Sequence, residues 1–148
     1  MVLELLKGVT TAGSGVRLRT SAHYYKDIIT GFPYEFTNPI AGKTGTTQNH
    51  TDGWFMGVVP NLATGVWTGG EDRAVHFENI AEGQGATMSL PTWALFMKKV
   101  YADTSLNISQ EDFEKPESIG IITTCGKDSS IKDKNSKKII PEDDDIDF

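Results

Sequence analysis

One short stretch of the chain holds residue types that could do chemistry. Residues 39–55 read PIAGKTGTTQNHTDGWF and place Lys43, Thr44 and Thr46 around Gly45. A lysine ammonium and threonine hydroxyls on one strand can hold a carboxylate through charge-assisted hydrogen bonds. A glycine lets another backbone lie alongside the strand, and the next backbone N–H can stabilise a developing oxyanion. The stretch could therefore bind a carboxylate and assist acyl transfer, or it could be an ordinary surface hairpin rich in small polar residues.

A phosphate-binding loop is an alternative interpretation of the same residues. Gly42, Lys43 and Thr44 match the end of the pattern G-x-x-x-x-G-K-[ST]. The pattern requires a glycine where this chain has Thr37, and Pro39 falls inside the loop. A phosphate loop also leads directly into a helix, whereas here a polar turn and the strand-like sequence WFMGVV follow. The sequence argues against a nucleotide site.

Three stretches around the candidate site have the composition of strands. They run from Asn38 to Thr47, from Gly53 to Val59 and from Thr64 to Gly70. The five polar residues from Gln48 to Asp52 suit a hairpin loop, and PNLA at 60–63 suits a tight turn. Three antiparallel strands in a meander is the simplest arrangement.

A helix is predicted before these strands. Its apolar residues recur at intervals of three and four, which places them on one face; they are Val2, Leu5, Leu6 and Val9. Gly13 and Gly15 would end this helix, and residues 16–36 predict mostly loop with some strand. The first residues indicate a helix already under way, as expected if the chain begins inside a larger domain.

A second helix is predicted after the strands. Its buried face is formed by Leu90, Trp93, Met97 and Val100, with Ala94 and Tyr101 beside them. Ser89 could cap this helix, or the helix starts near Gly85 and is kinked by Pro91. Trp93 and Met97 are interpreted as core residues. Helices packed on an antiparallel sheet give the α+β class.

Composition excludes several classes of function. A net charge of −6 and the lack of a basic stripe argue against a nucleic-acid partner. Cys125 is the only cysteine, so the chain has neither a disulfide framework nor zinc-ligand spacing, and no metal or organic cofactor is predicted. No apolar run is long enough to span a bilayer, so no membrane contact by this chain is predicted. Residues 126–148 are polar and acidic, which predicts a disordered tail.

Lys43-Thr44-Gly45 is also the last of three motifs, S-x-x-K, S-x-N and K-T-G, that penicillin-recognising serine enzymes use. The triplet alone is only weakly diagnostic, but longer stretches around it resemble the C-terminal part of the transpeptidase domain of a penicillin-binding protein. Their order most resembles the bifunctional class A type. The stretches are GSGVRLR at 13–19, residues 39–72, GATMSLPTWALFMKKVYAD at 85–103, and 113–129. Residues 1–125 are thus expected to be the C-terminal portion of such a domain.

The resemblance implies a role for each matching residue. Lys43 would supply positive potential and hydrogen bonds, and Thr44 and Thr46 would bind the carboxylate of a peptidoglycan stem peptide or of a β-lactam. The backbone N–H of Thr46 would form half of an oxyanion hole, with Gly45 permitting close approach. Three further residues are interpreted as packing positions: Thr47, Trp54 and Phe55. The histidines match no catalytic position and are expected in exposed loops: His23, His50 and His76.

The nucleophilic serine of the family has no counterpart in the expected place. Upstream of Lys43, Ser14 is followed three residues later by Arg17, and Ser21 by Tyr24. Formal matches downstream, at 105–107 and 129–132, lie on the wrong side of K-T-G. The chain is therefore expected to hold half of an active site, to be inactive alone, and to expose apolar surface that the missing N-terminal half would cover.

Two wider expectations follow from the resemblance. The complete parent protein would be anchored in the bacterial cytoplasmic membrane, with this domain outside the cytoplasm, and a glycosyltransferase domain would lie further upstream if present. The alternative to this enzyme fragment is a non-catalytic β-rich binding or interaction module with a coincidental K-T-G. An in-frame S-x-x-K and S-x-N upstream of Met1 would discriminate in favour of the enzyme.

Overall fold

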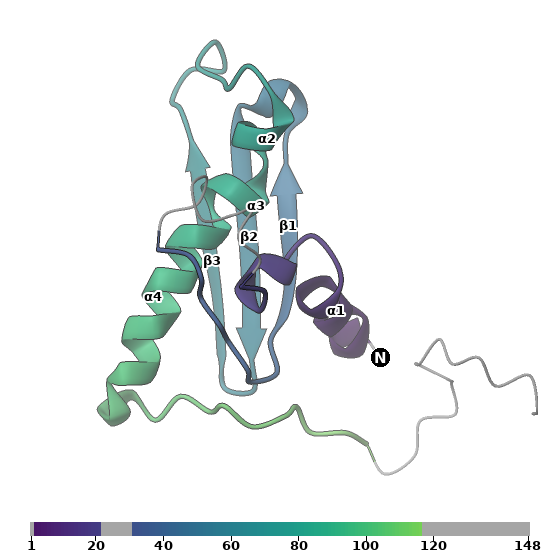
Figure 1. The fold of residues 1–148 in the computed structure, drawn as a ribbon, viewed down its shortest axis with the longest axis vertical. Helices are drawn as coiled ribbons and strands as arrows, with labels where there is room; N and C mark the ends of the chain where they lie inside the picture. Colours follow the sequence, from purple (N-terminus) through teal and green to yellow (C-terminus); the bar gives the residue numbers. More distant parts are fainter. Residues whose placement is uncertain (1, 22–30, 117–148) are drawn as a thin grey trace, which may run out of the picture.

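The computed structural model describes residues 2–21 and 31–116. At its centre is an antiparallel sheet in the order β1-β2-β3, made of β1 (Ala41–Thr46), β2 (Asp52–Val59) and β3 (Leu62–Gly69). Helices cover one face of the sheet and flank its β1 edge (Figure 1). The α+β class and the three-strand meander predicted from the sequence are confirmed.

The remaining elements lie before and after the sheet. They are α1 (Val2–Thr11), η1 (Val16–Leu18), η3 (Gln48–His50), α2 (Ile80–Gly83), α3 (Gly85–Met88), α4 (Leu90–Ala102) and η4 (Thr104–Leu106). Within residues 16–36, the described residues 16–21 and 31–36 contain η1 and no strand, and the remainder of the predicted loop and strand lies outside the described residues. The two described parts are joined by a hydrogen bond from Phe36 N to Leu18 O, 2.9 Å.

The strand boundaries differ from the predicted ones by a few residues. β1 begins at Ala41 rather than Asn38, and Pro39 just before it has no N–H to donate to a ladder. β2 and β3 each begin slightly earlier than predicted. Because β3 starts at Leu62, the turn between them is only residues 60–61, a tighter hairpin than PNLA implied.

The helix after the sheet is broken in two at Ser89. Both predicted starts are partly right, because α3 begins at Gly85 and α4 begins at Leu90, with Pro91 in its first turn. The Ser89 side chain makes no capping hydrogen bond, so the predicted cap is wrong. Its hydroxyl donates instead to the Gly53 carbonyl of β2, 2.7 Å away. This bond fastens the α3–α4 junction to the sheet.

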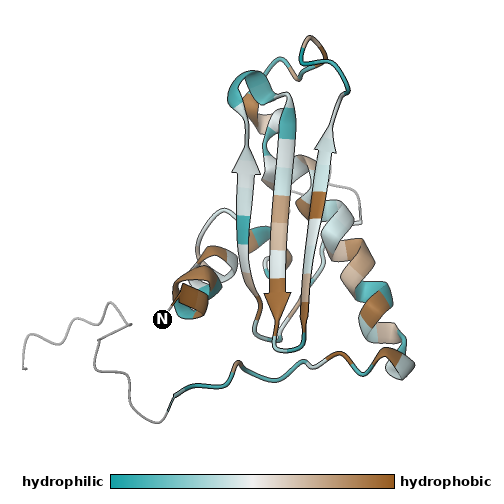
Figure 2. Ribbon diagram, turned by 180° about the vertical axis from the view of Figure 1, so that it is seen from behind, coloured by the Kyte–Doolittle hydropathy of each residue, from teal (hydrophilic) through white to brown (hydrophobic). Residues whose placement is uncertain are grey.

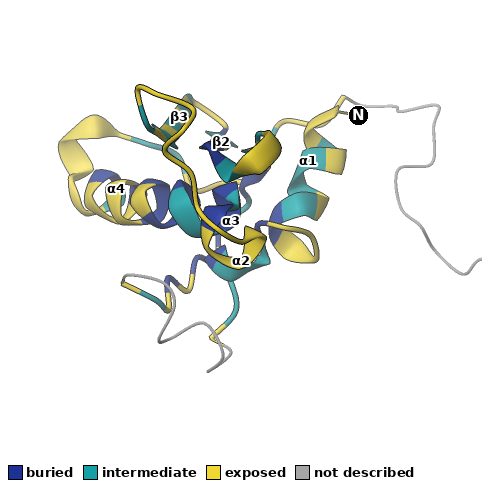
Figure 3. Ribbon diagram, turned by 90° about the horizontal axis from the view of Figure 1, so that it is seen from above, coloured by how far each residue is buried: buried dark blue, intermediate teal, exposed yellow. Residues whose placement is uncertain are grey.

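The core lies between the sheet and α4, as the helical spacing predicted. Figure 3 shows the buried residues gathered on β2, α3 and the inner side of α4. Trp93 and Met97 are fully buried, and the Trp93 ring meets Phe55 edge-on with centroids 5.1 Å apart. The Trp93 indole N–H is satisfied by the Thr64 hydroxyl at 2.7 Å. Burial of a tryptophan with a paired N–H makes Trp93 the anchor of the core.

The opposite face of the sheet is open in the described residues. Strand residues alternate between faces, so while Phe55 points into the core, Trp54 and Met56 on β2 are each 44% exposed and Trp67 on β3 is 49% exposed. Figure 2, seen from behind, shows this face with no helix in front of the strands. The predicted packing role of Trp54 is therefore not fulfilled, whereas that of Phe55 is.

Helix α1 flanks β1, and the residues of its predicted apolar face differ in exposure. Val2 and Leu5 are 64% and 63% exposed, while Thr10 is fully buried. The Thr10 hydroxyl donates to the Ile40 carbonyl at 2.6 Å, just before β1, and this bond sets how the helix meets the strand. Of the predicted apolar face of α1, Val2 and Leu5 are thus exposed, whereas Leu6 and Val9 are partly buried. No helix of the described residues is long and apolar enough to cross a membrane.

Candidate active-site strand

The candidate site occupies β1, which pairs only with β2 in the described residues and so has one edge without a strand partner, the open edge; α1 lies beside the start of this strand. Lys43 lies across from Met56 on the exposed face of the sheet, and Thr44 lies across from Phe55. The Lys43 ammonium bends over the open edge and donates to the Thr44 carbonyl, 2.5 Å away. A positive charge is therefore held at the open edge of β1.

The N–H of Thr46 also points to the open edge. In an antiparallel strand, successive residues direct their N–H groups alternately toward and away from the partner. The Thr47 N–H donates to the Asp52 carbonyl of β2 at 3.0 Å, so the preceding N–H, that of Thr46, faces away from β2. The lysine ammonium and this N–H are thus on the same side of the strand, as an oxyanion-binding wall requires.

The two threonine hydroxyls are held by groups far away in the sequence. The Thr44 hydroxyl is 2.7 Å from the Ser14 hydroxyl, in the loop after α1. The Thr46 hydroxyl accepts a hydrogen bond from the backbone N–H of Gly85, at the start of α3, at 3.0 Å. An oxygen that already accepts from Gly85 still has its own proton to donate to a carboxylate. The contacts of Ser14 and Gly85 with this strand were not predicted, because no local spacing signals them.

Gly45 lies on the exposed face, across from Trp54. A Cβ added at Gly45 would lie 3.2 Å from the Trp54 Cβ, which is tighter than side chains normally tolerate. Close contact with Trp54 is therefore a steric reason for a glycine at position 45. A substrate backbone lying along the strand would be a second reason, and that role stays a prediction.

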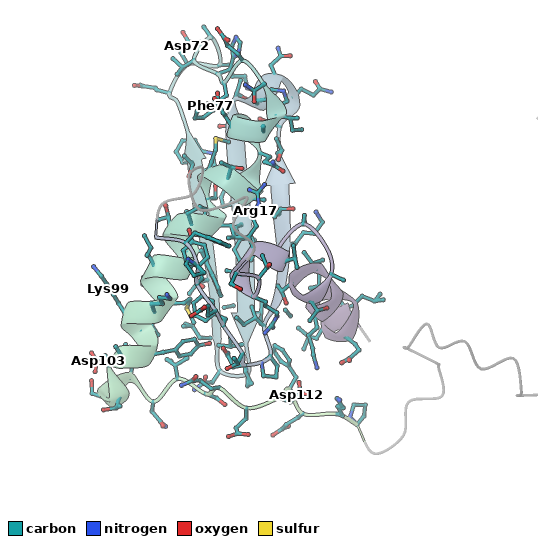
Figure 4. All side chains as sticks on the ribbon, in the orientation of Figure 1. Arg17, Asp72, Phe77, Lys99, Asp103 and Asp112 are labelled. Atoms are coloured by element: carbon teal, nitrogen blue, oxygen red, sulfur yellow. The ribbon has the colours of Figure 1, made fainter. Side chains whose placement is uncertain are left out.

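Arg17 joins the loop after α1 to α3 beside the candidate site. Its guanidinium Nη1 donates to the Thr87 hydroxyl at 2.6 Å, and the Thr87 hydroxyl donates to the Ala81 carbonyl at 2.9 Å. Figure 4 shows Arg17 at the level of α3, next to β1. The loop that carries Ser14 and the helix that carries Gly85 are thus tied to each other as well as to the strand.

The end of β1 is fixed by a network around Asp52. One carboxylate oxygen accepts hydrogen bonds from the hydroxyls of Thr51 (2.8 Å) and Thr47 (3.2 Å), and the other accepts from the Trp67 indole N–H at 3.1 Å. The hydrogen bond from Thr51, followed by those from Thr47 and Trp67, holds the pKa of the Asp52 carboxyl below its usual value. The network joins the β1–β2 loop to β3. Thr47, just after β1, thus contributes hydrogen bonds to Thr51 and Asp52.

Other chemistry-bearing residues are not part of this arrangement. His76 is exposed, as predicted, while His50 is only partly exposed and its Nδ1 is buried without a hydrogen-bond partner; His23 lies outside the described residues. Ser105, in the formal S-x-N match, sits after α4 and donates to Asp103 at 2.6 Å. The match at 129–132, Cys125 and the predicted tail at 126–148 also lie outside the described residues. Residues 2–21 and 31–116 hold no cluster of metal-ligating side chains.

A cavity of ≈ 330 Å³ lies away from the candidate site, beneath the loop that follows β3. Its lining is mostly apolar and consists of Thr51, Thr68, Gly69, Gly70, Val75, His76, Phe77 and Met88. Lys43, Thr44 and Thr46 do not contribute to it. The site on β1 is therefore separate from this cavity and lies on the edge strand of the described sheet.

Comparison with known proteins identifies the family. No family model matches the chain. The penicillin-binding protein 1A of Aquifex aeolicus is 32% identical over 100 residues, which are 68% of this chain and 13% of that protein. The penicillin-binding proteins 1A of Neisseria flavescens and Pseudomonas aeruginosa are each 34% identical, over 60% and 49% of the chain.

The matched segments are a small part of these relatives. They cover 13% of the Aquifex protein, 10% of the Neisseria flavescens protein and 8% of the Pseudomonas protein. The α+β fold with its antiparallel sheet agrees with a transpeptidase-like architecture. The chain belongs to the class A penicillin-binding protein family, and it corresponds to a fragment of the relatives that it matches.

Proposed function

We propose that this chain forms one wall of the acyl-transfer site of a penicillin-binding D,D-transpeptidase. The observation that carries the proposal is the open edge of β1, where the Lys43 ammonium and the Thr46 N–H lie on the same side. The family relationship supports a catalytic role for this edge, because Lys43-Thr44-Gly45 matches K-T-G, the last motif of penicillin-recognising serine enzymes. Residues 1–125 are proposed as the C-terminal portion of the transpeptidase domain, followed by a tail at 126–148.

The proposed chemistry divides between this chain and the rest of the domain. A serine outside this chain attacks the carbonyl of the stem peptide or β-lactam, and its oxygen forms an ester with the acyl carbon. The C–N bond to the leaving amine breaks, and the serine proton passes to that amine through a base that also lies outside this chain. The negative charge that develops on the carbonyl oxygen is stabilised by the Thr46 N–H. The hydroxyls of Thr44 and Thr46 and the charge of Lys43 hold the substrate carboxylate.

The open face of the sheet supports the proposal that the rest of the domain packs here. Trp54, Met56 and Trp67 expose apolar area of a kind that marks a contact surface when it is contiguous. The complete protein is proposed to be anchored in the cytoplasmic membrane with this domain on its outer side, where peptidoglycan is cross-linked. The partners are then the N-terminal half of the domain, stem peptides and β-lactams.

A fluorescent penicillin tests this function. The full-length protein should form a covalent adduct that survives denaturing electrophoresis, whereas the 148-residue chain alone should form none, because loss of a nucleophile and its base costs on the order of 10⁶ in turnover. Covalent labelling of the chain alone would contradict the proposal that the serine comes from elsewhere. Failure of the full-length protein to label would contradict the proposed activity and favour a non-catalytic module.

A substitution in the full-length protein assigns the labelling to β1. Lys43→Ala should slow acylation by about 10²–10³, the usual cost of removing one electrostatic contact from such a site. Lys98→Ala is the matched control, since Lys98 is an exposed lysine on α4 whose ammonium contacts the Pro33 carbonyl at 3.3 Å. Equal acylation rates for the two variants would remove Lys43 from the site.

A further inference from the structure

We propose that Gly85 is a positioning residue that sets the orientation of the Gly45–Thr46 peptide, and with it the N–H that faces the open edge of β1. The proposal rests on the function proposed above and deepens it. Gly85 is 39 residues from Thr46 in the sequence and approaches it only because α3 is seated on the sheet. Two independent features of Gly85 support the assignment, its hydrogen bond and its lack of a side chain.

The hydrogen bond holds the side chain of Thr46. The Gly85 N–H donates to the Thr46 hydroxyl oxygen at 3.0 Å. The bond occupies a lone pair of that oxygen and leaves the hydroxyl proton for another acceptor. It also restrains χ1 of Thr46, and therefore the backbone that carries the N–H. The first residue of α3 thus acts on the strand that bears the site.

The missing side chain lets α3 lie directly on the strand backbone. A Cβ built at Gly85 would overlap the Gly45 carbonyl oxygen and would lie 2.5 Å from the Trp54 carbonyl oxygen and 3.1 Å from the Trp54 nitrogen. These are backbone atoms of the paired strands, which cannot rotate away as the end of a side chain can. Any larger residue at position 85 has to displace α3 or turn the Gly45 carbonyl.

The Gly45 carbonyl and the Thr46 N–H belong to one planar peptide unit. Since this unit is trans and rigid, the carbonyl points toward β2 while the N–H points to the open edge. Turning the carbonyl to relieve a contact with position 85 turns the N–H by the same angle. The steric contact at Gly85 is thus transmitted to the oxyanion donor through a single peptide plane.

Nearby contacts keep α3 in this place. Ser89, at the end of α3, donates its hydroxyl to the Gly53 carbonyl at 2.7 Å and lies 3.1 Å from the Thr68 hydroxyl. A Cβ at Gly53 would lie 3.1 Å from the Gly85 Cα, so these two glycines bring helix and sheet into backbone contact. With both ends of α3 fastened, the helix cannot easily retreat, and strain at position 85 acts on β1.

Acylation kinetics of the full-length protein test the inference. In Gly85→Ala, the acylation rate constant with a chromogenic β-lactam should fall by about tenfold to a hundredfold, the cost of a misplaced catalytic group. The affinity of the complex before acylation should change little. The matched control is Gly57→Ala, whose Cβ would collide with the Trp93 ring of α4 and not with the Gly45–Thr46 peptide. With rates normalised to folded protein, this control should acylate at the wild-type rate.

The outcomes are distinct for the two proposals. If wild-type protein is not acylated, the proposed function is wrong whatever Gly85 does. If wild-type protein is acylated and Gly85→Ala matches it, or if Gly57→Ala slows acylation equally, the positioning role is overturned.

A second measurement covers the case in which Gly85→Ala does not fold. Hydrogen exchange of the Gly85 amide should be protected in the wild-type chain and in Thr46→Ser, which keeps the acceptor oxygen. It should lose protection in Thr46→Val, in which a methyl group replaces that oxygen. A Gly85 amide that exchanges freely in the wild-type chain, or equally in all three proteins, would overturn the inference.

Discussion

The two faces of the sheet differ although the same strands supply both. On the covered face, Phe55 and Trp93 are fully buried, and the indole N–H of Trp93 is paired. On the open face, Trp54 and Trp67 lie across from each other in the ladder and remain almost half exposed. The covered face forms a packed core with its indole N–H group satisfied. The open face has the residue types of a core and, in the described residues, nothing to pack on.

The candidate site depends on both the covered face and the unpaired edge of the sheet. The candidate residues lie on β1. This strand is hydrogen-bonded to α3 on the covered face of the sheet, and its edge away from β2 has no strand partner in the described residues. The covered side fixes the shape of the strand. The free edge supplies the chemical groups.

Removing the Trp93 side chain from the covered face should have the largest effect on the free energy of unfolding. Trp93→Ala should destabilise the chain by roughly 3–5 kcal/mol, through lost burial and a cavity that cannot close. Because a domain of this size has only a modest core, this loss should leave it unfolded by circular dichroism. Trp67→Ala, on the open face, should keep the fold and cost about 1 kcal/mol, mostly through its bond to Asp52. Equal costs would contradict the contrast between the faces.

The sequence predicted the covered face better than the open one. Helical spacing identified Leu90, Trp93, Met97 and Val100, and all four are buried. The same reasoning placed Val2, Leu5, Leu6 and Val9 on one face of α1, and of these Val2 and Leu5 are exposed while Leu6 and Val9 are partly buried. Hydrophobic periodicity shows which residues share a face and not whether a partner is present. Trp54 was assigned to packing from the family resemblance, and it is 44% exposed.

The candidate site was predicted only in its local part. Lys43, Thr44 and Thr46 were found because they are adjacent in the sequence and form a motif. Ser14 and Gly85 were not found, since their contacts arise from how α1 and α3 are seated on the sheet. A glycine selected for close backbone contact leaves no sign in a sequence beyond the glycine itself. The roles of the motif residues stay predictions until they are measured.

Two glycine substitutions, one on each face of the sheet, should differ moderately in their effect on the free energy of unfolding. Gly57→Ala places a methyl group against the Trp93 ring and should cost about 1–3 kcal/mol through overpacking. Gly65→Ala, on the exposed face of β3, meets only the thioether end of Met56, which can move aside. It should change the free energy of unfolding by less than about 0.5 kcal/mol. Urea denaturation of both variants measures the difference, and a costly Gly65→Ala would show that the open face is already packed.

The smallest effect distinguishes the faces by pH. Asp52 joins Trp67 on the open face to the β1–β2 loop through hydrogen bonds that favour the ionised carboxylate, so the pKa of Asp52 is lower in the folded chain than in the unfolded one, where it is near 3.8. The stability from this group is complete above the unfolded pKa and is lost as the pH falls through the folded pKa. Asp52→Asn should therefore lower the unfolding midpoint at pH 7, and the difference from wild type should shrink as the pH falls below 4.

Nuclear magnetic resonance can follow the hydrogen bond between the Trp67 indole and Asp52 directly. The Trp67 indole N–H signal should shift as Asp52 titrates, whereas the signal of Trp93, which is paired with the uncharged Thr64 hydroxyl, should stay constant over the same pH range. In Asp52→Asn the Trp67 shift should disappear, because an amide accepts a hydrogen bond but does not ionise. Parallel shifts of both indoles would show that acid loosens the whole fold at once, and that the open face has no separate electrostatic support.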